Sequence, residues 1–292
     1  MDRVCAVVVT YNRLELLKET LNALLEVNGS LEKVVVVNNA STDNTHEYLQ
    51  GLSKESPKVE EYLMKENLGG AGGFKAGLKY AFEQGYDYIW LMDDDSIVKK
   101  DSLGPLLEPF KKVEDVGFTC SKVIWTDGTP HKMNIPDVSR VNDNGVAFFG
   151  DEGYINVKSC SFVSMMVPAR IVDKLGLPYQ DFFIWCDDLE YSRRIIRAGY
   201  KGLFVEESQV VHKTVTNHNT NIQNCTPKEF WKMEYGFRNR TFMHRKFGEY
   251  NLMFLFFARN LYRSVSRKNH KLKAFSIVVG AFFKGIFFKP TA

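Results

Sequence analysis

The feature that most constrains the fold is the alternation of strand-like and helix-like segments in the first hundred residues. Runs rich in β-branched and other apolar residues predict strands over 4–10, 34–37 and 86–92. Leucines recur at helical spacing over 14–25, and a second helix is predicted over 72–84. Strands and helices in strict alternation predict an α/β fold with a mostly parallel sheet covered by helices on both faces.

A polar cluster follows each of these strands. The clusters are TYNR at residues 10–13, NNASTD at 38–43 and DDD at 93–95. Parallel sheets of this kind bind ligands beyond the carboxyl ends of their strands. The three clusters therefore predict a binding site on one edge of the sheet.

Two of the polar features have the chemistry of a metal site. Asp93, Asp94 and Asp95 are adjacent carboxylates, which repel one another unless a cation or water separates them, and Mg²⁺ or Mn²⁺ prefers such oxygens. His212 ends a strand predicted over 203–212 and could add an imidazole ligand. For each feature taken alone an alternative stays open: the three aspartates could form a solvated acidic turn, and His212 could have a structural role.

Two further segments lie at predicted helix starts. The segment Asn67–Lys75 is rich in glycine and would let backbone approach a ligand, although it matches neither the dinucleotide nor the Walker-A pattern and could be a plain turn. Asp187 and Asp188 follow an aromatic run that includes Trp185. One of these carboxylates could take a proton from a sugar hydroxyl, and at least one could simply cap the helix.

The global composition limits the partners and the compartment. The net charge of +3 does not require nucleic acid as a partner. Five dispersed cysteines show no disulfide framework, and the first apolar run is too short for a secretory signal, so we expect a reducing, cytoplasmic location.

The chain changes character towards its C-terminal end. Further strands are predicted over 117–125 and 159–167, and a helix over 187–199. We expect a catalytic domain over 1–225, with a nucleotide-binding half over 1–100 and an acceptor-binding half over 101–225. Residues 226–292 are aromatic and basic, with no apolar stretch long enough to span a bilayer. This helical region is predicted to lie at an anionic membrane surface, or alternatively to pack on the core or in a homo-oligomer.

Taken in order, TYNR, VVVNNASTD, ENLGGAGGF, LMDDDS, FIWCDDLEY and VVHK resemble the family-2 inverting glycosyltransferases with the GT-A fold. The resemblance covers about residues 3–215 and is most similar to the galactofuranosyltransferase branch, with rhamnosyltransferases next. It implies an Mn²⁺ or Mg²⁺ site at Asp93, Asp95 and His212. It also implies Asp188 as catalytic base, with Asp187 as second choice, and Trp185 at the acceptor. The positions implied in donor binding are Thr10, Tyr11, Arg13, Asn38, Asn39, Asn67, Gly70 and Asp94.

The resemblance also implies substrates. The donor would be a UDP-sugar, with UDP-galactofuranose favoured over dTDP-rhamnose, although Asn38 and Asn39 stand where relatives place an Asp that contacts uracil. The acceptor would be a glycan or lipid-linked glycan of a cell-surface polysaccharide, met at the inner face of the cell membrane. A metal-dependent nucleotidyltransferase is disfavoured because no basic glycine-rich loop follows the first strand. A non-catalytic membrane scaffold would leave the acidic clusters unexplained.

Overall fold

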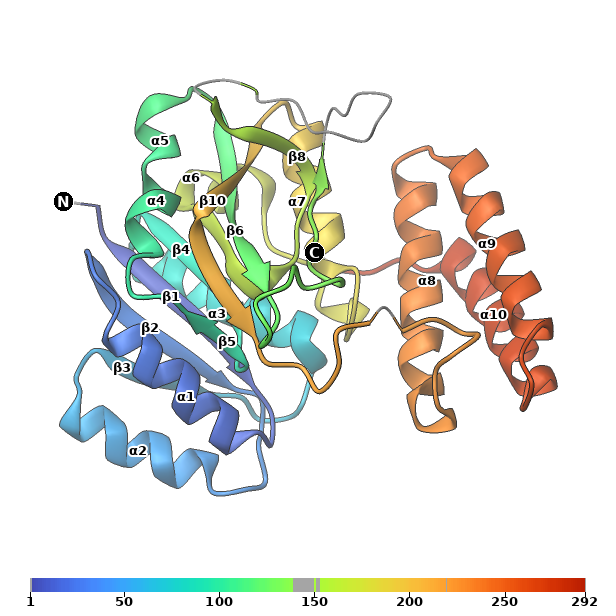
Figure 1. Cartoon of the computed structure of the whole chain (residues 1–292), viewed down its shortest axis with the longest axis horizontal. Helices are drawn as coiled ribbons and strands as arrows, with labels where there is room; N and C mark the ends of the chain where they lie inside the picture. Colours follow the sequence, from blue (N-terminus) through green and yellow to red (C-terminus); the bar gives the residue numbers. More distant parts are fainter. Residues whose placement is uncertain (1, 139–149, 151–152, 219, 292) are drawn as a thin grey trace.

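The computed structural model describes residues 2–138, 150, 153–218 and 220–291, and in this part of the chain one mixed sheet of ten strands organises the fold (Figure 1). Its strand order is β3-β2-β1-β4-β9-β6-β10-β8-β7, with β5 beside β10. The elements of the N-terminal half are β1 (Val4–Thr10), α1 (Leu14–Leu25), β2 (Leu31–Asn38), α2 (Thr45–Glu55), β3 (Val59–Leu63), α3 (Gly69–Glu83), β4 (Tyr88–Asp93), β5 (Ser96–Val98), α4 (Leu103–Leu107) and α5 (Pro109–Lys112).

The N-terminal half is parallel and covered on both faces, which confirms the predicted layering. Strand β1 pairs in parallel with β2 and with β4. Because side chains alternate along a strand, Ala6 and Val8 pack under α1, α2 and α4, whereas Val7 and Val9 pack under α3. Helix α3 begins at Gly69, three residues before the predicted start.

The second half extends the sheet with antiparallel pairs through β9. The strand predicted over 159–167 is wrong, because the chain there forms the end of β8, a short 3₁₀ turn at Phe162–Ser164, and the start of β9. The remaining elements are β6 (Val116–Ile124), β7 (Asp137–Val138), β8 (Ile155–Ser159), β9 (Met165–Pro168), α6 (Ala169–Leu175), η3 (Gln180–Phe182), α7 (Asp187–Arg197), β10 (Lys201–His212), η4 (Pro227–Glu229), α8 (Phe230–Lys246), α9 (Tyr250–Val265) and α10 (Lys271–Phe287).

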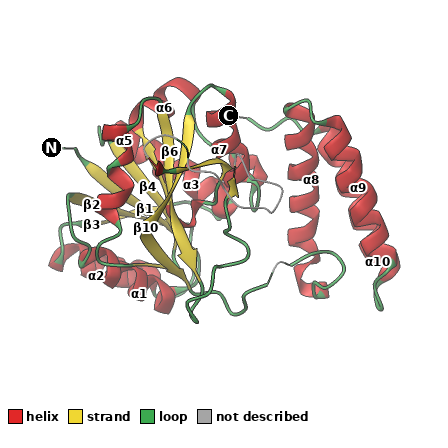
Figure 2. Ribbon diagram, turned by 45° about the horizontal axis from the view of Figure 1, so that its top comes forward, coloured by secondary structure: helices red, strands yellow, loops and turns green. Residues whose placement is uncertain are grey.

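Helices α8, α9 and α10 form a group beside the sheet domain (Figures 1 and 2). Their shared apolar core includes Phe237, Ile277 and Val278. After α10 the chain returns to the sheet domain, where Phe288 packs against Phe182 and Phe242. Among the described helices, none has the length and apolar character that crossing a membrane needs. The helical region is therefore packed both on itself and on the domain that carries the site.

Candidate active site

The register of the sheet brings the predicted polar clusters to one edge. Thr10 is paired with Asn38, and its neighbour Val9 is paired with Asp93, so the ends of β1, β2 and β4 coincide. Strand β5 then runs antiparallel to β10 and pairs Ser96 with His212. This pairing carries the histidine, from more than a hundred residues away in the chain, to the acidic loop. The predicted convergence of the clusters is confirmed.

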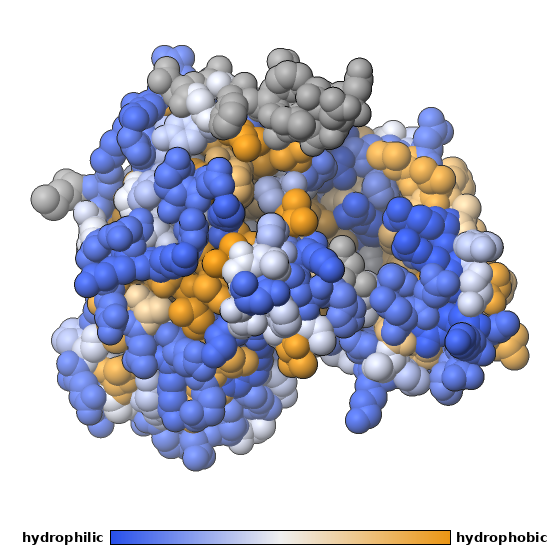
Figure 3. All heavy atoms as spheres, in the orientation of Figure 1, coloured by the Kyte–Doolittle hydropathy of each residue, from blue (hydrophilic) through white to orange (hydrophobic). Residues whose placement is uncertain are grey.

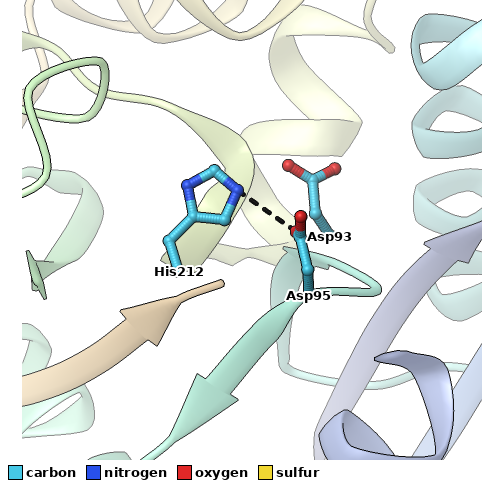
Figure 4. A group of neighbouring side chains, drawn as sticks. All are labelled: Asp93, Asp95 and His212. Atoms are coloured by element: carbon cyan, nitrogen blue, oxygen red, sulfur yellow. Dashed lines mark ion pairs between the residues drawn. The ribbon is translucent and has the colours of Figure 1, made fainter. Parts of the chain in front are cut away.

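Asp93, Asp95 and His212 point towards one another in a small cluster (Figure 4). One possible ligand atom from each lies within 4.8 Å of the others. Burial, with Asp95 beside it, raises the pKa of Asp93 to about 6. Burial also disfavours the charged form of Asp95, but His212 and Arg13 outweigh it and hold the pKa of Asp95 below its usual value.

The hydrogen bonds of His212 suit a metal ligand. Its Nδ1 lies 2.8 Å from Asn134 Oδ1, and Asn134 Nδ2 donates to Ser161 Oγ, which fixes the amide so that Nδ1 is the donor. Nε2 lies 3.1 Å from Asp95 Oδ1 and forms an ion pair with it when the ring is protonated. With a cation between Nε2 and Asp95 Oδ1, the ring would be neutral and Nε2 would be a ligand atom. That carboxylate oxygen is buried and has no hydrogen-bond partner in the described structure. The carboxylate oxygens of Asp93 and Asp95 and the imidazole nitrogen of His212 are ligand types that suit Mn²⁺ or Mg²⁺.

Asp94 and Arg13 form a second layer under this cluster. Arg13 makes ion pairs with Asp94 and Asp95, and Thr10 Oγ1 donates to Asp94 Oδ2 at 2.8 Å. Burial raises the pKa of Asp94 to about 7 although Arg13 lies against it. The Arg13 side chain is still 42% exposed, and Tyr11 is exposed beside it, so both can reach a ligand.

The amides of Asn38 and Asn39 are already engaged within the protein. Asn38 Nδ2 donates to Glu61 and its Oδ1 accepts from Ser41 N–H. Asn39 Nδ2 donates to Gly69 O, and its Oδ1 accepts from Leu68 N–H. Both side chains are buried, so these bonds shape the edge of the site, and contact with a nucleotide base stays a prediction.

The glycine-rich segment packs against the rest of the site. A Cβ at Gly69, which has φ +71°, would lie 2.0 Å from Phe183 O, and one at Gly73 would strike Val9. Asn67 Oδ1 accepts from Gly69 N–H, and Ala71 N–H donates to Phe183 O. Close packing therefore accounts for Gly69 and Gly73, and the approach of this segment's backbone to a ligand stays a prediction. Gly70 has open space where a side chain would be.

The loop before α7 has a strained backbone and is held by a residue that is distant in sequence. Phe183, Trp185 and Cys186 have positive φ values of 63°, 63° and 70°, which non-glycine residues rarely adopt. Asn239, on α8 and fully buried, donates to the carbonyl oxygens of Phe182, Ile184 and Trp185 at 2.9–3.1 Å. Helix α8 thus fixes the loop that presents the paired aspartates.

Asp187 and Asp188 begin α7 in a low-dielectric environment. Asp187 is buried and Asp188 is half-buried, so this helix start is largely shielded from solvent. Burial, together with the charge of Asp188, raises the pKa of Asp187 well above its usual value. Burial raises the pKa of Asp188 to about 6, and the charge of Asp93 adds to the shift. The two carboxylate clusters therefore act on each other electrostatically.

A pocket of about 590 Å³ adjoins this loop. Asp188 and Trp185 line it, whereas Asp187 does not. Gly236 allows the indole to lie close to α8, because a Cβ there would be 2.8 Å from Trp185 Cε3. Sequence reasoning did not identify Asn134, Asn239 or Arg240 on this side of the site. No local pattern marks them, since each acts through a contact made only in the fold.

With this geometry known, comparison with other proteins is informative. Residues 5–175, more than half of the chain, match the family described as Glycosyl transferase family 2. The chain belongs to this family. Galactofuranosyltransferase GlfT1 of Mycolicibacterium smegmatis is 29% identical over 206 residues, which are 67% of this chain and 66%, just under two thirds, of that protein. Poly-beta-1,6-N-acetyl-D-glucosamine synthase of Staphylococcus aureus is 28% identical over 117 residues, 40% of this chain and 27% of that protein.

Solved structures share the fold. GalNAc-T7, crystallised with UDP, GalNAc and Mn²⁺, has a TM-score of 0.63 at 15% identity, over 84% of this chain and 48% of that one. The mannosyltransferase PcManGT of Pyrobaculum calidifontis, in complex with GDP-Man and Mn²⁺, has a TM-score of 0.58 at 16% identity, over 96% and 73%. The predicted GT-A fold and the similarity to the galactofuranosyltransferase branch are confirmed.

Proposed function

We propose that this family-2 protein transfers a sugar, with inversion, from a nucleoside-diphosphate donor to a carbohydrate acceptor. The observation that carries the proposal is the placement of Asp188 in a pocket, within electrostatic reach of the cluster of Asp93, Asp95 and His212. A base and a diphosphate-binding centre are the two parts that a single displacement needs. The names of the galactofuranosyltransferase relatives support UDP-galactofuranose as donor.

In the proposed step the acceptor hydroxyl oxygen attacks the anomeric carbon and the bond from that carbon to the diphosphate oxygen breaks. Asp188 accepts the hydroxyl proton, and its raised pKa suits a base that works near neutral pH. Trp185 would orient the acceptor ring, and Asp187 is the second candidate for the base. Configuration at the anomeric carbon inverts because there is one displacement.

The donor would lie along the sheet edge. Asp93, Asp95 and His212 would hold Mn²⁺ or Mg²⁺, which when bound neutralises charge on the departing diphosphate. Exposed Tyr11 and Arg13 would contact the nucleotide, with Gly70 at the start of α3. Five further residues of the predicted donor site would hold its edge in place through hydrogen bonds within the protein: Thr10, Asn38, Asn39, Asn67 and Asp94.

The donor is tested by incubating the full chain and Mn²⁺ with UDP-galactofuranose, and separately with dTDP-rhamnose, and measuring release of the nucleoside diphosphate. We expect release from UDP-galactofuranose. Release from dTDP-rhamnose alone would make UDP-galactofuranose the wrong donor, while the proposed transfer chemistry would stand. Absence of release from any nucleotide sugar would contradict the proposed function.

The helical region is proposed to dock on the inner face of the cell membrane, where a lipid-linked glycan acceptor would be found. Exposed side chains of this region include Phe254 and Leu255 on α9 and Lys271 and Lys273 on α10, and apolar patches lie along its outer edge (Figure 3). Flotation with phosphatidylglycerol vesicles should recover the protein, and F254E/L255E should not float. Equal recovery of both would contradict docking through this surface.

A further inference from the structure

Three arginines from the helical region line the same pocket as Asp188. Arg240 comes from α8, and Arg259 and Arg263 come from α9, where a spacing of four residues puts them on one face of the helix. Arg240 and Arg263 are half-buried and Arg259 is exposed. Positive charge therefore gathers on the wall opposite the catalytic loop.

These arginines have no acidic partner within the described structure. Among the described residues, no carboxylate lies within 4.0 Å of any of the three guanidinium groups, although Asp137 and Asp188 line the same pocket. Arg240 Nε is buried without a hydrogen bond. Partial burial lowers the pKa of Arg259, and the charges of Arg263 and Arg240 lower it further. Like charges held together without a counter-ion are unfavourable unless an anion joins them.

The position of the cluster relates it to the acceptor. The pocket contains Asp188, and the charge of Arg240 partly offsets the raised pKa of that carboxyl group. The cluster of Asp93, Asp95 and His212, which would hold a cation at the donor diphosphate, does not line this pocket. An anion bound by the arginines would therefore belong to the molecule whose hydroxyl Asp188 deprotonates.

Resting on the proposed function, we propose that Arg240, Arg259 and Arg263 form a subsite for a phosphoryl group, so that the acceptor carries a phosphate or diphosphate. Guanidinium groups bind phosphate oxygens through paired, charge-assisted hydrogen bonds. Phe237 and Phe256 line the same pocket and offer apolar surface beside the anion. The acceptor is thus a sugar joined through a phosphate or diphosphate to a second group, which is either a lipid or a soluble molecule.

Calorimetry on the full chain in EDTA, without nucleotide sugar, tests the subsite. The probes are inorganic diphosphate, farnesyl diphosphate and phosphatidylglycerol vesicles. R259Q/R263Q is compared with K54Q/K79Q, which removes the same charge from exposed positions on α2 and α3 outside the pocket. We expect R259Q/R263Q to weaken diphosphate binding by about 10- to 100-fold, as loss of two charge-assisted contacts implies. K54Q/K79Q should bind like the wild type, and thermal melting checks that both variants are folded.

The outcomes separate this inference from the proposed function. Arginine-dependent binding of inorganic diphosphate supports the phosphoryl subsite, and binding of farnesyl diphosphate alone supports it for a lipid-linked acceptor. Equal binding by the two variants, no binding by the wild type, or arginine-dependent binding of vesicles alone would overturn it. If no nucleotide sugar is turned over while binding still depends on the arginines, the transferase proposal fails and the anion site stands. If R259Q/R263Q transfers sugar to a diphosphate-linked acceptor at the wild-type rate, the transferase proposal stands and the phosphoryl subsite fails.

Discussion

The two sides of the site, which we call the donor side and the acceptor side after their proposed roles, are built in different ways. On the donor side, Thr10, Asn38 and Asp93 end neighbouring parallel strands, and sheet register alone brings them together. On the acceptor side, Asp188 follows a strained loop that Asn239 supports from 54 to 57 residues away in sequence. The donor side is a rigid sheet edge whose residues are placed by the strands that carry them. The other is a wall whose shape depends on how the helical region packs.

Removal of the metal should have the largest effect, because it acts on the rigid side where nothing else can replace the missing charge. Transfer in EDTA should fall below detection and return with Mn²⁺ or Mg²⁺. The cluster of Asp93, Asp95 and His212 motivates the prediction. Isothermal titration of Mn²⁺ into the wild type and H212A should show weaker binding by the variant. Undiminished transfer in chelator would remove the cation from the donor side.

Asp188→Asn tests the acceptor side next. The amide cannot accept a proton, and general-base assistance contributes about 10²- to 10⁴-fold, so kcat should fall by that factor while the KM for donor changes little. In the wild type, kcat should rise with pH through about 6, because the base works only when ionised. The residual rate of the variant should lack this step. A variant with normal turnover would exclude Asp188 as the base.

Asn239→Ala should have a smaller effect, through the loop that carries the base. Three carbonyl oxygens would lose their donor, and we expect kcat to fall about 10-fold and stability by about 1–3 kcal/mol. Asn239→Asp also lacks the N–H donors and would place a carboxylate against these carbonyl oxygens, so it should lower stability further than Asn239→Ala. Exposed Asn251→Ala on α9 is the control and should change neither kcat nor the unfolding midpoint. A loss in donor KM alone would show that the helical region supports the donor side as well.

The sequence predicted the donor side well because its signals are local. The runs of β1, β2 and β4, and the polar residues after them, follow from hydrophobic pattern and strand order. The missed elements include α2 and β3, whose weaker patterns are mostly polar. The strand predicted over 159–167 failed because Phe162–Ser164 is apolar for burial reasons and forms a 3₁₀ turn.

The acceptor side was predicted only in part. The pair Asp187 and Asp188 has a local signature at a helix start. Its burial has no such signature, because the loop before the pair is held by Asn239 of α8 only in the fold. The positive φ values of Phe183 and Trp185 occur without a glycine or asparagine to announce them. The arginines of the pocket are scattered over two helices, and a basic helix in isolation indicates a solvated or membrane-facing surface equally well.

The smallest predicted effect concerns Asp187. Its substitution should raise the stability of the protein, whereas the changes above lower activity or stability. Its pKa is raised in the folded state, so the folded protein holds the proton more tightly than the unfolded chain does. The free energy of unfolding therefore decreases as pH rises from the unfolded value of about 4 towards the folded one. Asp187→Asn removes this penalty. At pH 7.5 we expect the variant to melt about 2–4 °C higher than the wild type, the shift that about 1 kcal/mol gives in a domain of this size.

The pH dependence separates this cause from a general gain in packing. Below about pH 4, where Asp187 is protonated in both states, the melting temperatures of wild type and Asp187→Asn should converge. Asp173→Asn, an exposed aspartate on α6, should leave the melting curve unchanged at both pH values. If Asp187→Asn melted lower than the wild type at pH 7.5, its carboxylate would be held by helix-start hydrogen bonds stronger than its burial penalty. The acceptor wall would then be built for stability at this residue, as the donor edge is at Asn38 and Asn39.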